Sequence, residues 1–128
     1  MSLISILSSS KNNFLDLEET GHVSQYELFK KLEISEEIQF KIVEYAKKIG
    51  ITIFSSPFDN TAVDLLEDLN TPAYKIASFE AIDLPLIKYV ASTGKPMVIS
   101  TGMADADEIH EAIETAKENG CNELAILH

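Results

Sequence analysis

Three short apolar runs between Ile51 and Thr101 each end in a hydroxyl-bearing residue, and this repetition constrains the fold more than any other feature of the sequence. The runs end at Ser55-Ser56, at Ser78 and at Ser100-Thr101. Strands of a parallel sheet are buried on both faces and read as apolar runs, and α/β folds bind ligands at the carboxyl ends of such strands. We therefore interpret the hydroxyls as part of the ligand-binding face of an α/β enzyme. The alternative is that they only cap the helices that follow.

Two helices are predicted before the first of these runs. Ser24 and Glu27 have the spacing of a capping box and predict a helix that continues to Leu32. Ser35 caps a second helix, which Gly50 ends as the expected left-handed residue. Its predicted apolar stripe consists of Ile38, Ile42, Tyr45, Ala46 and Ile49.

The rest of the chain repeats a strand-then-helix unit. The predicted strands are 51–54, 73–77, 96–100 and 123–128. The helices between them are predicted to begin at Asp59, Asp83 and Asp105, of which Asp59 and Asp83 serve as caps, and to end near Leu69, Gly94 and Asn119. A repeat of about 22–27 residues with this alternation predicts a parallel α/β protein.

The choice between parallel folds depends on the number of strands and on the loops. A small doubly wound sheet would suit 128 residues, but no strand is followed by a glycine-rich dinucleotide-binding turn or a P-loop. A closed (β/α)8 barrel needs eight strands and about 250 residues. Because the sequence stops on a strand at His128, we expect a partial TIM (β/α)8-type barrel of about four strands. We place it at residues 24–128, after a poorly readable segment, 1–23, in which Ile4–Leu7 could form a short strand.

Composition and charge exclude several classes of function. With 21 acidic and 10 basic residues the net charge is -11, so we expect no nucleic-acid partner and no anionic membrane partner. Cys121 is the single cysteine, which excludes a disulfide framework and a CxxC metal motif. The first residues lack the features of a signal peptide, and no apolar run approaches the roughly 20 residues that span a bilayer. The expected location is cytoplasmic.

Several linked motifs resemble those of the sialic acid (nonulosonic acid) synthase family. They are SSPFD at 55–59, PAYKIASFE at 72–80, DLPLIKYVASTGKPMVISTGM at 83–103 and the terminal AILH. The resemblance implies a (β/α)8 barrel enzyme that condenses phosphoenolpyruvate with an N-acyl hexosamine and releases phosphate. Phe79 stands where N-acetylneuraminate synthases commonly have glycine, and Ala-Ser-Phe-Glu looks more like the pseudaminic acid branch. This difference would change the wall of the pocket.

The resemblance also implies roles for individual residues. Phosphoenolpyruvate carries a phosphate and a carboxylate, so its site needs a fixed cation and several hydrogen-bond donors. Lys75 is the one basic residue within a predicted strand, where a lysine is unfavourable unless it meets an anion, and we expect it to bind the phosphate. Ser56, Ser78 and Ser100 match ligand contacts of the family. Glu80 matches a carboxylate near the reacting carbon, and we expect it to act as general acid/base.

The family uses a divalent metal, manganese or magnesium, whose histidine ligands lie on later strands than this chain contains. Within the chain the possible ligands are carboxylates and His128, and no two histidines stand at ligand spacing, so we expect no confident metal site. We also expect a homo-oligomer, and we expect the chain alone to be catalytically silent. The alternatives are a non-catalytic oligomeric or binding fragment, and a barrel aldolase or lyase that uses Lys75 as a Schiff-base nucleophile.

Overall fold

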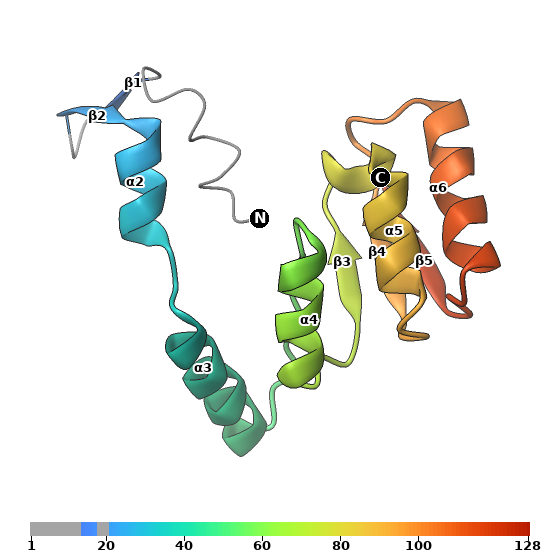
Figure 1. Ribbon diagram of the computed structural model, residues 1–128, viewed down its shortest axis with the longest axis horizontal. Helices are drawn as coiled ribbons and strands as arrows, with labels where there is room; N and C mark the ends of the chain where they lie inside the picture. The colour runs from blue at the N-terminus through green and yellow to red at the C-terminus, as the bar shows by residue number, and fades with distance from the viewer. Residues whose placement is uncertain (1–13, 18–20) are drawn as a thin grey trace.

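The computed structural model describes residues 14–17 and 21–128 (Figure 1). The elements in chain order are β1 (Phe14–Leu17), β2 (Gly21–Ser24), α2 (Gln25–Leu32), α3 (Glu36–Ile49), α4 (Asn60–Asp68), β3 (Tyr74–Ile76), the 3-10 helix η2 (Glu80–Ile82), α5 (Leu84–Ala91), β4 (Met97–Ser100), α6 (Ala106–Glu118) and β5 (Leu124–Leu127). Figure 1 shows β3, β4 and β5 packed with α4, α5 and α6, while α2 and the β1–β2 pair lie apart from this sheet.

The three later strands form a parallel sheet in the order β3-β4-β5, which confirms the predicted α/β class. Tyr74 pairs with Met97, and Met97 pairs with Leu124, so the register is continuous across the sheet. Side chains alternate between the faces of a strand, and on one face they are buried beneath the helices. The largest fully buried side chains of this layer are Tyr74, Ile76, Ile87, Val90, Met97 and Ile99.

Aspartates, and not the hydroxyls at the strand ends, cap the three helices of the repeat. The Asp59 carboxylate accepts a hydrogen bond from Ala62 N, and that of Asp83 accepts one from Leu86 N. Asp105 forms a full capping box with Glu108 at the start of α6. The predicted caps at Asp59 and Asp83 are therefore confirmed, and the helix-capping explanation of the strand-end hydroxyls is wrong for this part of the chain.

The expected strand at 51–54 does not form. Only Ser55 makes a bridge to β3, through Tyr74, and Lys75 N donates to Ser55 O at 3.1 Å. Donors alternate along a parallel ladder, so the next N–H on that side would come from residue 57. This residue is Pro57, which has no N–H to donate. Because β3 begins only at Tyr74, residues 51–54 also have no strand opposite them. The parallel sheet therefore has three strands and one added bridge, where four strands were expected.

The N-terminal expectations have mixed outcomes. The helix after Ser24 is present as α2, but the Ser24 side chain makes no capping hydrogen bond, so the predicted capping box is wrong. β1 and β2 form an antiparallel pair that the sequence did not lead us to expect. The possible strand at Ile4–Leu7 lies outside the described residues.

Helix α3 begins and ends as predicted, but its apolar stripe is largely unburied. Ser35 accepts a hydrogen bond from Ile38 N, and Gly50 ends the helix with a φ of 75°. Of the stripe only Ala46 is buried, and the remaining members are 45–63% exposed. The stripe therefore faces too little protein, within the part of the chain that the structure describes, to be covered.

A hydrogen-bonded network joins α4, β3 and the turn before β4. The Tyr74 hydroxyl lies 2.6 Å from Glu67 Oε1, and Lys95 Nζ lies 2.8 Å from the same oxygen. Burial would raise the pKa of Glu67, but the hydrogen bonds from Lys95 and Tyr74 and the charge of Lys95 outweigh it, and the pKa is lowered. Burial and the bond to Glu67 raise the pKa of Tyr74.

We predict that Glu67→Gln lowers the free energy of unfolding at pH 7 by about 1 kcal/mol, since the network is partly exposed to water. A carboxylate whose pKa is lowered in the folded state stabilises the fold at pH values above its pKa in the unfolded chain, here 4.5. This stabilisation is lost as the pH falls through the folded-state pKa. The difference between wild type and variant should therefore shrink below that pH in urea denaturation. Glu37→Gln, in an exposed pair with Lys41, is the control and should change the free energy by less than about 0.5 kcal/mol. A constant difference down to pH 3 would contradict the assignment.

Candidate functional site

The sheet presents two chemically different faces, and Lys75 lies on the one that the helices leave uncovered. Tyr74 and Ile76, its neighbours in β3, are fully buried under the helices, whereas Lys75 is half-buried. Lys75 pairs with Val98 of β4. Ser100 lies two residues after Val98 and therefore points to the same face. The register thus places the predicted cation and one predicted hydroxyl donor on a common surface.

Ser78 lies where the loop after β3 meets the loop after β4. A Cβ atom built on Gly102 would lie 3.6 Å from Ser78 Oγ, so the two loops are in contact at this point. Glu80 N donates to Ala77 O at 3.0 Å, which closes the turn that holds Ser78 in place. Ser78, in the loop after β3, thus lies against the loop that follows Ser100 at the carboxyl end of β4.

Glu80 begins η2, two residues after Ser78, and one of its oxygens has no partner. Its Oε2 atom is buried from solvent and accepts no hydrogen bond from the described residues. A buried carboxylate oxygen without a donor is unfavourable by about 1–3 kcal/mol. Such an atom can accept a hydrogen bond from a hydroxyl group or a water molecule that enters with a ligand. A general base must be able to accept a proton in this way.

Ser56 is less clearly joined to the other predicted site residues. It is half-buried and follows the bridge residue Ser55 on the outer side of β3, where it lines a groove beside α3. The same bridge places Ser56 next to Lys75 along the ladder, while no side-chain hydrogen bond among the described residues joins it to Lys75, Ser78 or Ser100. The register therefore relates Ser56 and Ser100 to Lys75, whereas Ser78 and Glu80 follow β3 in the loop and η2.

Thr101 has a role that its place in the sequence did not reveal. It is 3% exposed, and its N–H and its hydroxyl both bind Leu127 O, at 3.0 and 3.1 Å. The hydroxyl also lies 3.3 Å from His128 Nδ1. Thr101 thus ties the carboxyl end of β4 to that of β5 and fixes the position of His128 at the same edge as Ser100. Nothing in the sequence around Thr101 indicates this bond, because its partner lies 26 positions later.

The polar groups of this edge are largely free to meet a ligand. Within the described part of the chain, the Lys75 ammonium and the hydroxyls of Ser78 and Ser100 make no side-chain hydrogen bond or ion pair. One cation and two hydroxyl donors suit an anionic oxygen ligand. Glu80, two residues after Ser78 in sequence, carries a further oxygen without a partner among the described residues.

A metal site is not present among the described residues. They contain no group of three or more His, Cys, Asp or Glu side chains that could hold an ion, so His128 has no co-ligands there. In the same residues no helix is long and apolar enough to cross a membrane.

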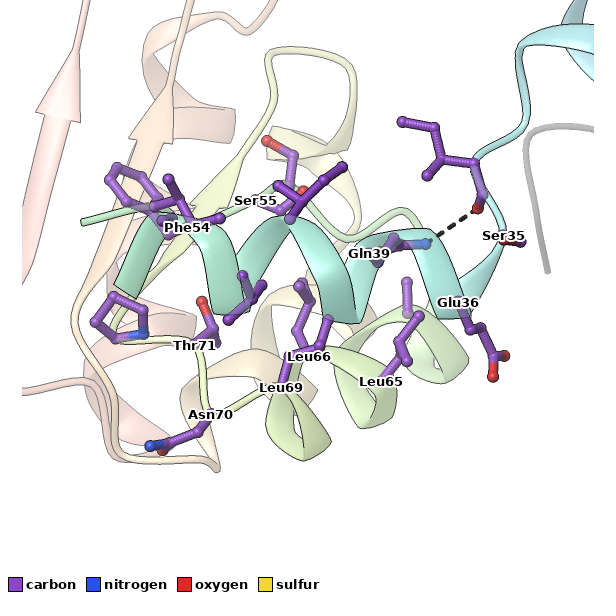
Figure 2. Close-up of a pocket in the computed structure, with 18 of the residues that line it drawn as sticks. Ser35, Glu36, Gln39, Phe54, Ser55, Leu65, Leu66, Leu69, Asn70 and Thr71 are labelled. Atoms are coloured by element: carbon purple, nitrogen blue, oxygen red, sulfur yellow. Dashed lines mark hydrogen bonds between the residues drawn. The ribbon is translucent and has the colours of Figure 1, made fainter. Parts of the chain in front are cut away.

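A groove of about 1470 Å³ lies away from these groups (Figure 2). It runs between α3 and α4, and Figure 2 shows Leu65 and Leu66 of α4 and its C-cap residue Leu69 along it. Most of its lining is apolar, and of the predicted site residues it includes only Ser56. An anionic ligand needs fixed donors and a cation, so we regard the groove as incompletely packed helix surface and place the candidate site at the carboxyl edge of the sheet.

Comparison with known proteins supports the resemblance noted in the sequence. The model of the NeuB family matches residues 3–128. An uncharacterized protein of Methanocaldococcus jannaschii is 50% identical over 103 residues, which cover 80% of this chain and 31% of that protein. The pseudaminic acid synthase of Helicobacter pylori is 42% identical over 102 residues, which cover 80% of this chain and 30% of the synthase.

A solved structure resembles the fold as well. The N-acetylneuraminic acid synthetase of Leptospira borgpetersenii matches with a TM-score of 0.76 and 27% identity, over 80% of this chain and 36% of that one. The chain thus spans about a third of the length of the relatives it matches.

We predict that Glu80→Met raises the free energy of unfolding by about 1 kcal/mol, because it removes a buried oxygen that has no donor. The measurement is urea denaturation at pH 7. The same substitution at Glu108, whose Oε2 accepts a hydrogen bond from Asp105 N at 2.8 Å, is the matched control and should lower stability by about 1 kcal/mol. Destabilisation by Glu80→Met would mean that Glu80 supports the fold and is not held ready for a ligand.

Proposed function

The chain belongs to the NeuB family, and from this premise we propose that it is the phosphoenolpyruvate-binding segment of a nonulosonic (sialic-type) acid synthase. The reaction condenses phosphoenolpyruvate with an N-acyl hexosamine and releases phosphate. The observation that carries the proposal is the set of unpaired groups at the carboxyl edge, where Lys75, Ser78, Glu80 and Ser100 come from two neighbouring β/α units. The named synthases among the relatives support it.

In this proposal the residues divide between binding and proton transfer. The Lys75 ammonium binds the phosphate, and Ser78 and Ser100 donate hydrogen bonds to its oxygens or to the carboxylate. Ser56, which stands next to Lys75 along the ladder, adds a further hydroxyl donor. Glu80 accepts a proton from the attacking water or sugar hydrate, through the oxygen that lacks a donor.

The chemistry explains why these groups belong together. A carbon–carbon bond forms between the methylene carbon of phosphoenolpyruvate and the aldehyde carbon of the open-chain sugar. Water adds to the central carbon of phosphoenolpyruvate, and the phosphate leaves with the bonding electron pair. Fixed donors on the phosphate stabilise the charge that collects there. Glu80 takes one proton from the water, and the aldehyde oxygen gains one proton to become a hydroxyl. The second water proton leaves with the phosphate as the central carbon becomes a carbonyl.

The described residues do not fit the divalent manganese or magnesium ion that this chemistry would use. We therefore propose that most ligands of such an ion lie outside this chain, and that the chain alone does not turn over substrate. Since phosphoenolpyruvate is a metabolite of the cytoplasm, we also propose a cytoplasmic location. The buried, unpaired thiol of Cys121 is consistent with this location.

A second function, that of an oligomeric binding module, is supported by the uncovered stripe of α3. Ile38, Ile42, Tyr45 and Ile49 are each at least 45% exposed, and contiguous apolar surface of this kind favours association. The two functions are compatible, because the stripe and the carboxyl edge are different surfaces.

We predict that phosphoenolpyruvate shifts the backbone amide signals of Lys75, Ser78 and Ser100 in the chain, with or without magnesium. Lys75→Met should weaken binding by about 10–100-fold, because it removes a charged hydrogen bond. Lys88→Met, on the exposed side of α5, is the control and should bind as wild type does. Absence of shifts in a folded chain would refute the proposed binding site. Release of phosphate at an ordinary enzymatic rate by the chain alone would refute the prediction that the chain alone is catalytically inactive.

We predict that the chain self-associates through the α3 stripe and is at least a dimer by light scattering. Ile42→Asp should shift it toward monomer, since a charge cannot be buried in an apolar contact without a large loss of free energy. Glu44→Gln, a polar change on the same helix, should leave the mass unchanged. A monomer at high concentration would exclude the oligomer.

A further inference from the structure

The two ends of the sheet layer are open in complementary ways. At one end, α3 packs on the core through Val43 and Ala46 and leaves its apolar stripe exposed. At the other end, β5 is the edge strand of the parallel sheet. Figure 1 shows α3 beyond α4 and β5 beyond β4, at opposite ends of the layer.

The strand β5 is less covered by helices than the strands beside it. Ile76, Ile99 and Ile126 form one row across the sheet, on the face that the helices cover. Ile76 is 0% exposed and Ile99 is 1% exposed, but Ile126 is 40% exposed. Strands of a parallel sheet are normally buried on both faces. The described helices therefore leave β5 partly uncovered, while α3 is a helix with an uncovered stripe.

The backbone of β5 has an open side. Thr101 N donates to Leu127 O, so the backbone groups of Leu127 face β4. Backbone groups alternate in direction along a parallel ladder, and the N–H and C=O of Ile126 therefore face away from β4. A row of such groups is a template for the addition of another strand.

The segment 51–55 has an open side as well. Lys75 N donates to Ser55 O, so by the same alternation the N–H groups of Thr52 and Phe54 face away from β3. Neither group makes a backbone hydrogen bond within the described part of the chain. Both run in the direction of the parallel sheet, since the bridge of Ser55 to Tyr74 is parallel. The segment can therefore accept a parallel strand on this side.

The number of units indicates what would close both open sides. The described elements form four helix–strand units, which are α3 with 51–56, α4 with β3, α5 with β4, and α6 with β5. A closed (β/α)8 barrel contains eight strands and eight helices, so two copies of the four units supply the number at which the barrel closes. In that arrangement α3 of one copy lies over β5 of the other, where Ile126 lacks cover.

Charge favours α6 of a second copy over its α3 as the neighbour of α3. Helical geometry places Lys41 and Lys48 along the border of the stripe, on the side away from Val43. Helix α6 carries one lysine and five carboxylates, which are Asp107, Glu108, Glu111, Glu114 and Glu118. A contact between two α3 helices would place lysines on both partners. A contact between α3 and α6 would instead bring lysines near carboxylates.

We propose that two copies of the chain associate head to tail, with β5 of each copy paired in parallel to residues 51–55 of the other and α3 packed over β5, so that they close an eight-stranded barrel. The contact joins two different surfaces, and two such contacts complete the ring. The inference rests on the second of the functions proposed above, that of an oligomeric module. The face that carries Lys75 becomes the interior of the barrel.

The first experiment tests the open side of β5 in the 128-residue chain. Ile126→Pro removes an N–H that faces away from β4, and proline is tolerated at a sheet edge, so the chain should fold but associate at least about tenfold more weakly. Ile126→Val keeps the N–H and is the matched control, with association within about threefold of wild type. Light scattering gives the mass. In the dimer, hydrogen exchange should show protected amides at Thr52, Phe54 and Ile126.

The second experiment mixes two variants that are each impaired. Ile42→Asp damages α3 and keeps β5, whereas Ile126→Pro damages β5 and keeps α3. A head-to-tail ring of one copy of each retains one intact contact, so the mixture should form a 1:1 dimer at least about tenfold more tightly than either variant forms its own. A mixture of Ile42→Asp with Ile49→Asp, both damaged in α3, is the control and should stay monomeric.

The outcomes separate this inference from the proposed functions. A dimer that a folded Ile126→Pro chain forms as tightly as wild type, or mixed variants that do not associate, would overturn the head-to-tail barrel and leave another oligomer. Assemblies larger than a dimer would overturn closure at two copies. A monomer at high concentration would overturn both the barrel and the oligomeric module, and would leave a further segment of a longer chain as the partner of the two open sides. The phosphoenolpyruvate shifts test the other proposed function independently.

Discussion

The packing of Tyr74 is the contact on which the sheet layer depends. Its side chain is fully buried, and its hydroxyl binds Val63 O and Glu67 of α4. Its N–H binds Pro96 O, just before β4, and its backbone forms the bridge to Ser55. One residue thus joins a helix, the central part of the sheet and the segment 51–56. Because Tyr74 points under the helices, Lys75 must point to the opposite face, and the position of the candidate site follows from the packing of the core.

Local signals predicted much of the fold correctly. The start of each helix in the repeat depends on a carboxylate and the N–H groups two or three residues later, and this information lies within one turn of the chain. The end of α6 is equally local: Gly120 has a φ of 112°, and a side chain there would approach Ala91 O to 3.1 Å. The linked motifs at 72–80 and 83–103 likewise predicted the family, because several short matches in order are more specific than any one alone.

Interactions between distant segments could not be predicted from local patterns. The apolar segment 51–54 has the composition of a strand, but it pairs only where β3 offers a partner, and Pro57 ends the ladder. Ser24 has the right spacing for a capping box, but its side chain makes no capping bond. At the candidate site, residue type identified Lys75 and Glu80, whereas the register of β3 on β4 decides that Lys75 shares a face with Ser100. The bond from Thr101 to the end of β5 joins residues 26 positions apart and has no local signal.

Each β/α loop of the repeat assigns folding and ligand contact to different residues. A hydroxyl that is a candidate ligand contact stands at the strand end, and an aspartate three to five positions later begins the helix, as with Ser78 and Asp83. Between them, Phe79 and Ile82 are 73% and 57% exposed and are fixed by neither task. They can therefore vary in size and polarity without unfolding the helix or displacing the strand-end group. A family built on such loops can change the sugar it accepts by substitutions that are nearly neutral for stability, so new specificities are open to it even when the protein has little stability to lose.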